Sequence, residues 1–135
     1  MIMKDFMILR GVVLFFILFL TGCGQIKVEG KVSFPDGAPL PVGKVVFEDS
    51  KSTFTANIKK DGTFRMGMLK DGEGIPAGKY KVAIADALGL EQAAPGKQPV
   101  QKNLVAPKFR TTATSGIEYD IQKSQKDISI VVERP

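Results

Sequence analysis

One cysteine and the complete absence of histidine decide which chemistry this chain of 135 residues can perform. Cys23 has no second cysteine with which to form a disulfide inside the molecule. A metal site built from several cysteines is excluded for the same reason. Without histidine, neither a Ser-His-Asp triad nor a Cys-His pair can form. The thiol of Cys23 is therefore a candidate for modification rather than for catalysis.

The residues before Cys23 have the order of a secretory signal. Lys4 and Arg10 give a basic start, and an uncharged apolar run (GVVLFFILFL) occupies residues 11–20. The alternative, an uncleaved membrane-spanning helix, needs about 20 apolar residues, which is more than this run provides. We expect residues 1–22 to be a helical signal peptide that is removed.

Leu20, Thr21, Gly22 and Cys23 together resemble the lipobox of bacterial lipoproteins. The resemblance implies a diacylglycerol thioether on Cys23, often with a further acyl chain such as palmitate on its amino group. Two or more acyl chains anchor a protein stably. Ordinary signal cleavage is the alternative, and it would leave an exposed thiol in an exported protein. We expect residues 23–27 to be a lipidated tether at a membrane of the bacterial cell envelope.

The residue after the cysteine bears on which membrane holds the protein. In Gram-negative systems an aspartate at that position favours retention at the inner membrane, whereas this chain has Gly24. The resemblance therefore favours the outer membrane slightly, with the domain facing the periplasm or the exterior.

Carboxylates are the remaining candidates for metal binding or catalysis. Asp71, Glu73 and Asp86 offer oxygen ligands for calcium, but they lack the spacing of an EF-hand loop. Glu118 and Asp120 lie two apart in an expected strand, so they share its solvent face, and no aromatic sugar platform accompanies them. We expect no metal, no cofactor and no enzymatic activity, and a carboxylate-dependent hydrolase is the weakest alternative.

The formal charge of +5 comes from scattered lysines rather than from a basic cluster. Nucleic-acid binding needs a concentrated basic patch, so we expect no nucleic-acid partner. The hydroxyl-rich stretch Thr111–Ser115 either contacts a polar ligand or simply connects two strands, and we favour the connection.

The remainder of the chain, residues 28–135, has the pattern of a single all-β domain. Short segments alternate apolar and polar residues, which is typical of strands with one buried face. Asp61-Gly62 predicts a tight hairpin turn, and Tyr80 is expected to bury its ring and to hydrogen-bond a backbone partner. Seven expected strands and their turns indicate a β-sandwich; they cover residues 28–34, 44–48, 53–60, 63–66, 79–84, 116–121 and 127–133.

Residues 86–106 show no sustained period, although 88–94 fit one or two helical turns. Irregular segments of this length are commonly functional or disordered, and both readings stay open. We take this segment as the candidate contact with a ligand or partner. Its candidate contact residues are Leu88, Glu91, Gln92, Lys97 and Gln101.

Several motifs, in order, resemble the carboxypeptidase-regulatory-like domains. They are VEGKV (28–32), PDGAPL (35–40), KDGTF (60–64) and IPAGKYKV (75–82). The resemblance implies a transthyretin-like (prealbumin-like) Greek-key sandwich of seven strands. The hydroxyisourate hydrolases of that fold depend on histidines, so their activity is excluded here.

A narrower resemblance covers the C-terminal part. Pro107-Lys108-Phe109 and Thr114-Ser115-Gly116-Ile117 are similar to the tails of small exported lipoproteins of planctomycete-type bacteria. We therefore expect a lipid-anchored, non-catalytic binding or structural module of the cell envelope that contacts an envelope protein or glycan. The alternative is a lipoprotein that binds carbohydrate or another small ligand. The oligomeric state stays open.

Overall fold

The structure, a computed structural model, describes residues 25–67 and 72–135. These residues form nine β-strands and the short 3₁₀ helix η2, with no α-helix among them. The elements are β1 (Val28–Ser33), β2 (Lys44–Glu48), β3 (Thr53–Asn57), β4 (Thr63–Arg65), β5 (Gly78–Ala85), β6 (Leu88–Glu91), β7 (Val100–Asn103), η2 (Pro107–Arg110), β8 (Ile117–Ile121) and β9 (Gln125–Val131).

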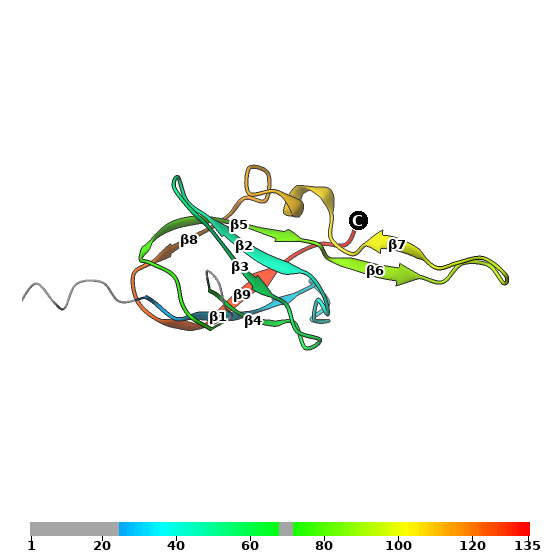
Figure 1. The fold of residues 1–135 in the computed structure, drawn as a ribbon, viewed down its shortest axis with the longest axis horizontal. Helices are drawn as coiled ribbons and strands as arrows, with labels where there is room; N and C mark the ends of the chain where they lie inside the picture. The colour runs from blue at the N-terminus through cyan, green and yellow to red at the C-terminus, as the bar shows by residue number, and fades with distance from the viewer. Residues whose placement is uncertain (1–24, 68–71) are drawn as a thin grey trace, which may run out of the picture.

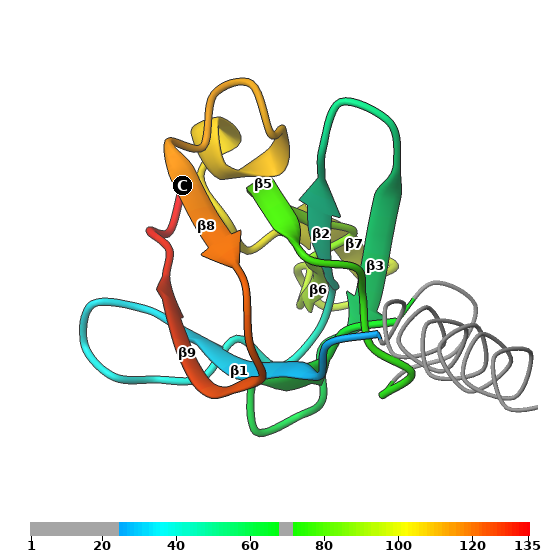
Figure 2. The ribbon, with the colours of Figure 1, turned by 90° about the vertical axis from the view of Figure 1, so that its left-hand side faces the viewer.

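Seven of the strands form two sheets that face each other (Figure 2). One sheet has the order β4-β1-β9 and the other has the order β3-β2-β5-β8. β1 and β9 run parallel, while every other pair in these two sheets is antiparallel. The predicted all-β, sandwich-like fold is confirmed, and each predicted strand segment overlaps one strand of these sheets.

The alternation of side chains along each strand builds the core. In β3, Phe54 and Ala56 are buried while the residues between them are exposed. Phe47 of β2 lies at the centre, with its ring centroid 5.8 Å from that of Tyr80. Phe54 meets the same tyrosine edge-on at 5.9 Å. The opposite sheet completes the core with Val28, Val32, Phe64, Ile128 and Ile130.

Tyr80 occupies the position that the sequence predicts for it. Its side chain is 1% exposed, and its hydroxyl donates a hydrogen bond of 2.6 Å to the carbonyl oxygen of Pro76. Both residues belong to the IPAGKYKV motif, so this bond links the turn of the motif to its strand. The hydroxyl closes the turn onto the strand that follows it.

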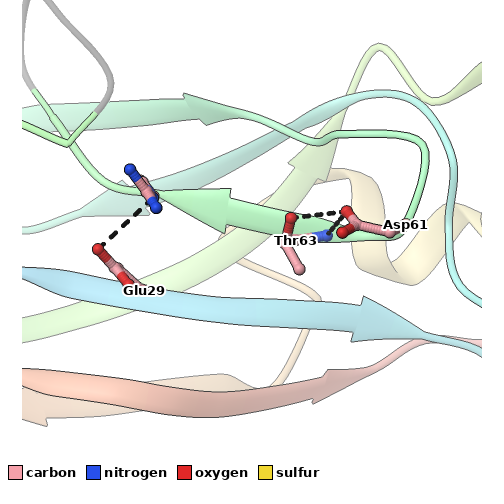
Figure 3. A network of polar contacts seen from close by, with 4 residues as sticks. Glu29, Asp61 and Thr63 are labelled. Carbon is pink, nitrogen blue, oxygen red and sulfur yellow. Dashed lines mark hydrogen bonds and ion pairs between the residues drawn. The ribbon is translucent and has the colours of Figure 1, made fainter.

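The Asp61-Gly62 tight turn forms, closed by the Lys59 amide, which donates to the Thr63 carbonyl oxygen at 2.9 Å, but the strands on either side of it do not pair as a hairpin. The amide and hydroxyl of Thr63 donate to the Asp61 carboxylate at 3.1 and 2.6 Å (Figure 3). These bonds lower the pKa of Asp61 below its usual value. However, β3 pairs with β2 whereas β4 pairs with β1. The turn crosses from one sheet to the other because β4 belongs to the sheet opposite the one that holds β3, where Phe64 of β4 is buried in the core.

Residues 86–106 form a β-hairpin instead of the helical turns expected over 88–94. β6 and β7 pair antiparallel as a separate two-stranded sheet, which projects from the sandwich at one end of its long axis (Figure 1). The Leu-Gly-Leu-Glu sequence of β6 alternates with a period of two, as strands do. Gly96, at φ 88°, turns the chain back. The hairpin brings the strand total to nine.

The connection from β7 to β8 packs on the sandwich through η2 and the hydroxyl-rich stretch. Phe109 of η2 is buried in the core. Ser115 is buried too, and its hydroxyl donates a hydrogen bond to the carbonyl oxygen of Val82 in β5. The amide of Ile117 in turn donates to the Ser115 hydroxyl at 3.3 Å. This stretch therefore connects η2 to β8 and ties the start of β8 to β5.

Replacing Tyr80 tests the aromatic centre. Tyr80→Ala removes a buried ring and should lower the free energy of unfolding by about 3–5 kcal/mol. Tyr80→Phe keeps the ring but leaves the Pro76 carbonyl without this donor. This variant should therefore lower the free energy of unfolding by only about 1 kcal/mol. Urea unfolding followed by circular dichroism measures both values. Equal losses for the two variants would contradict the separate roles of ring and hydroxyl.

Replacing Ser115 tests the connection to β8. Ser115→Ala should lower the free energy of unfolding by about 1–3 kcal/mol, because a buried carbonyl loses its donor. The control is Thr112→Ala, whose exposed hydroxyl donates only to the Glu48 side chain at 3.1 Å. That variant should change stability by no more than about 0.5 kcal/mol in urea unfolding. If Ser115→Ala behaves like the control, the buried hydrogen bond is not stabilising.

Candidate functional site

The lipobox residues Leu20, Thr21, Gly22 and Cys23 lie outside the described residues, as does the predicted signal helix. The described chain begins at Gln25, and the backbone is already held at the next residue. The Ile26 amide donates to the Ile75 carbonyl oxygen at 2.7 Å, and the Ile75 amide donates back at 2.9 Å. The folded domain therefore begins within three residues of Cys23.

All five predicted contact residues of the 86–106 segment lie on the hairpin, and all five are exposed. Leu88 and Glu91 belong to β6, Gln92 and Lys97 to the turn region, and Gln101 to β7. The structure thus gathers these five residues on one projecting element.

The most exposed apolar residues of the hairpin were not singled out from the sequence. Leu90 is 73% exposed and Val100 is 62% exposed. Leu90 lies opposite Gln101 and shares a face with Leu88, while Val100 lies opposite Glu91 on the other face. The alternation of β6 was the signal that could have found Leu90. Exposed apolar side chains concentrated on one projecting element are typical of an interaction site.

The root of the hairpin is fixed to the sandwich. Ala87 and Val105 are buried in the core, and the Leu104 amide donates to the Ala87 carbonyl oxygen at 2.8 Å. The Arg110 guanidinium donates to the Val105 carbonyl oxygen at 3.0 Å. Asp86 takes a positive φ of 53° where β5 turns into the hairpin. The body of the molecule therefore holds the arm at both of its strands.

The charges of the hairpin balance one another. Lys102 pairs with Glu91 at 3.6 Å, and Asp86 pairs with Lys44 at the root, at 3.8 Å. Lys97 offsets the charge of Asp86 within the hairpin, and the remaining polar surface is largely amide, from Gln92, Gln98, Gln101 and Asn103. The hairpin therefore suits a partner surface that is uncharged overall, which it can meet with apolar side chains, amides and free backbone edges.

Glu118 and Asp120, the carboxylates considered as a hydrolase pair, lie on the exposed outer face of the sheet. Glu118 lies opposite Lys81 across the β5–β8 pair, and Asp120 lies opposite Lys79. Each carboxylate therefore has a lysine as its cross-strand neighbour, rather than a carboxylate facing it across a cleft. Such an arrangement stabilises the sheet and lacks the geometry of a glycosidase pair.

The calcium candidates are not brought together as a site. Asp71 lies outside the described residues, and Asp86 pairs with Lys44 at the hairpin root. Across residues 25–67 and 72–135, no group of three or more carboxylate, cysteine or histidine side chains is placed to hold a metal ion.

A second candidate site, also missed from the sequence, surrounds Tyr119 of β8. Its ring stacks on Phe47 with an interplanar angle of 3° and a centroid distance of 6.1 Å. Its hydroxyl donates to the Ser129 carbonyl oxygen at 3.2 Å, and partial burial raises its pKa. Two hollows of about 570 and 550 Å³ have Tyr119 among their lining residues; β5 and β8 line the first, and the β8–β9 turn and β9 line the second. A half-buried ring beside an open hollow can contact a small polar ligand.

Comparison with protein-family models, with curated proteins and with solved structures finds no match to the chain. Among the residues that the structure describes, no helix has the length and apolar character needed to cross a membrane. Fold and site geometry are therefore the basis of the functional conclusion.

Proposed function

We propose that this protein is a lipid-anchored module of the bacterial cell envelope whose β6–β7 hairpin binds an envelope partner without catalysis. The observation that carries the proposal is the hairpin itself, which is fixed at its root and exposes Leu88, Leu90 and Val100. The lipobox resemblance at Cys23 supports the anchor. The early start of the folded chain at Ile26 keeps the domain close to that anchor.

The fold that we propose is the transthyretin-like Greek key of the carboxypeptidase-regulatory-like domains. Seven strands in two facing sheets support it, as does the bond between the Tyr80 hydroxyl and Pro76 within the IPAGKYKV motif. The buried Phe109 and Ser115 give a structural reason for the tail that resembles the planctomycete-type lipoproteins. Fold alone assigns no activity.

Strand addition is the binding mode that suits the hairpin. A two-stranded sheet has two edges with unpaired backbone groups, and a partner strand can add to either edge. An isolated two-stranded hairpin is only marginally stable in water, so a third strand also stabilises the arm. Leu90 or Val100 then supplies the apolar contact on one face.

The Tyr119 site supports a second candidate function, the binding of a carbohydrate or another small polar ligand. The partly exposed ring offers an apolar surface beside the β8–β9 turn and β9, whose residues line one hollow with it. Lys79, Lys81, Glu118 and Asp120 line the other hollow, on the outer face of the sheet. The hollow is open and shallow on the strands rather than closed by loops, which is why the hairpin is the first choice.

The anchor is tested by fatty-acid labelling in cells. Labelled palmitate should be incorporated into the wild type and not into Cys23→Ala, because no other cysteine is present to be modified. Detection is by gel and by mass spectrometry of the N-terminal peptide. Equal labelling of the two proteins would overturn the proposed anchor.

The hairpin is tested by in-cell cross-linking with mass spectrometry. Leu90→Asp should reduce the yield of the main cross-linked partner at least about tenfold, as expected for an apolar anchor residue of an interface. The matched control is Val131→Asp, which changes another exposed apolar residue, 50% exposed and in β9 rather than in the hairpin. Equal yields for the wild type and Leu90→Asp would contradict the role of the hairpin. A loss seen only with Tyr119→Ala would favour the second candidate.

A further inference from the structure

Three lysines without ion-pair partners gather at the end of the sandwich where the chain enters the fold. They are Lys27, Lys123 and Lys126, and all three are exposed. The Gln125 amide donates to the Lys27 carbonyl oxygen at 3.0 Å, which holds the β8–β9 turn beside the start of β1. None of these lysines forms an ion pair among the described residues.

Two acidic residues near this end already have partners. Glu29 pairs with Arg65 at 3.5 Å on the outer face of the three-stranded sheet (Figure 3). Asp120 accepts a hydrogen bond of 2.6 Å from the Gln122 amide and lies opposite Lys79. Residues 122–129 contain one acidic residue, Asp127, and two lysines. Glu73 also belongs to this end, since it lies two residues before Ile75. The three lysines outnumber Glu73 and Asp127, so the local surface keeps a small excess of positive charge.

This lysine end is also the end nearest to Cys23. Three residues of extended chain span at most about 10 Å, and Ile26 is fixed by its two hydrogen bonds to Ile75. If Cys23 carries the lipid, as the proposed function holds, then the lysine end cannot leave the headgroup region. The β6–β7 hairpin lies at the opposite end of the long axis (Figure 1).

We propose that Lys27, Lys123 and Lys126 bind anionic phospholipid headgroups and thereby orient the domain. The anchor alone fixes distance but leaves the domain free to tilt. Each lysine held at an anionic surface contributes about a fivefold preference for contact, so three favour one orientation strongly. In that orientation the hairpin points away from the membrane, towards a partner that lies beyond the headgroups. This inference rests on the proposed lipid anchor.

The orientation is tested on the full lipidated protein in vesicles. Because lipidation consumes the only native thiol, Ser124→Cys in the β8–β9 turn or Gln98→Cys in the hairpin can each carry one fluorophore. The vesicles are phosphatidylcholine with or without phosphatidylglycerol, and a nitroxide lipid headgroup quenches the fluorophore at short range. We expect quenching at position 124 that needs phosphatidylglycerol and is lost at high salt, and no quenching at position 98.

The charge variant is Lys27→Gln with Lys123→Gln and Lys126→Gln. It should lose the quenching at position 124 that depends on phosphatidylglycerol. The matched control, Lys60→Gln with Lys97→Gln and Lys102→Gln, removes the same charge elsewhere and should keep that quenching.

Flotation with the vesicles separates the two hypotheses. A wild type that does not float with the vesicles refutes the lipid anchor. The orientation alone is overturned if the wild type floats but its quenching at position 124 is the same with and without phosphatidylglycerol. It is also overturned if the charge variant is quenched at position 124 as strongly as the wild type. Quenching at position 98 equal to that at position 124 overturns it as well.

Discussion

The packing of Tyr80 against Phe47 and Phe54 is the interaction on which the rest of the molecule depends. It joins β2, β3 and β5 on the inner face of the larger sheet. β5 then leads directly into the hairpin at one end and pairs with β8 along its side. Because strands are stiff over this length, fixing the ring of Tyr80 fixes the direction in which the hairpin leaves the sandwich. The packing of Phe47 against Tyr80 also fixes the position of the Phe47 ring, on which Tyr119 stacks.

The sequence is sufficient to predict the strands of the sandwich, but it does not show which strands pair with each other. Alternation identified β1, β2, β3 and β5 because one face of each is buried. The parallel pairing of β1 with β9 joins residues about a hundred positions apart, and no local pattern reports it. The Asp61-Gly62 turn shows the same limit. Its local chemistry was read correctly, but which strand β4 pairs with is decided by the burial of Phe64 in the opposite sheet.

The segment that the sequence suggests as a contact is exposed, but its hairpin form was not predicted. Leu88, Glu91, Gln92, Lys97 and Gln101 are exposed on a projecting element, as a binding segment requires. Its hairpin form was missed because β6 has only four residues, too few to separate a period of two from a helical turn. Leu90 was missed for the same reason. Tyr119 was overlooked since its importance comes from Phe47 beneath it and from the Ser129 carbonyl in another sheet.

The hairpin presents two open strand edges of its own. The sandwich joins its own edge strands on both sides: a bridge between Thr55 and Gly67 links the β3 side to the chain after β4. On the other side, the Tyr119 hydroxyl ties β8 to Ser129 of β9. The edge strands of the sandwich thus have these single links across the gap between its sheets, whereas β6 and β7 have only each other as neighbours and project away from both sheets. The same sheet therefore combines open backbone edges with exposed Leu90 and Val100, and strand addition to it needs no rearrangement of the core.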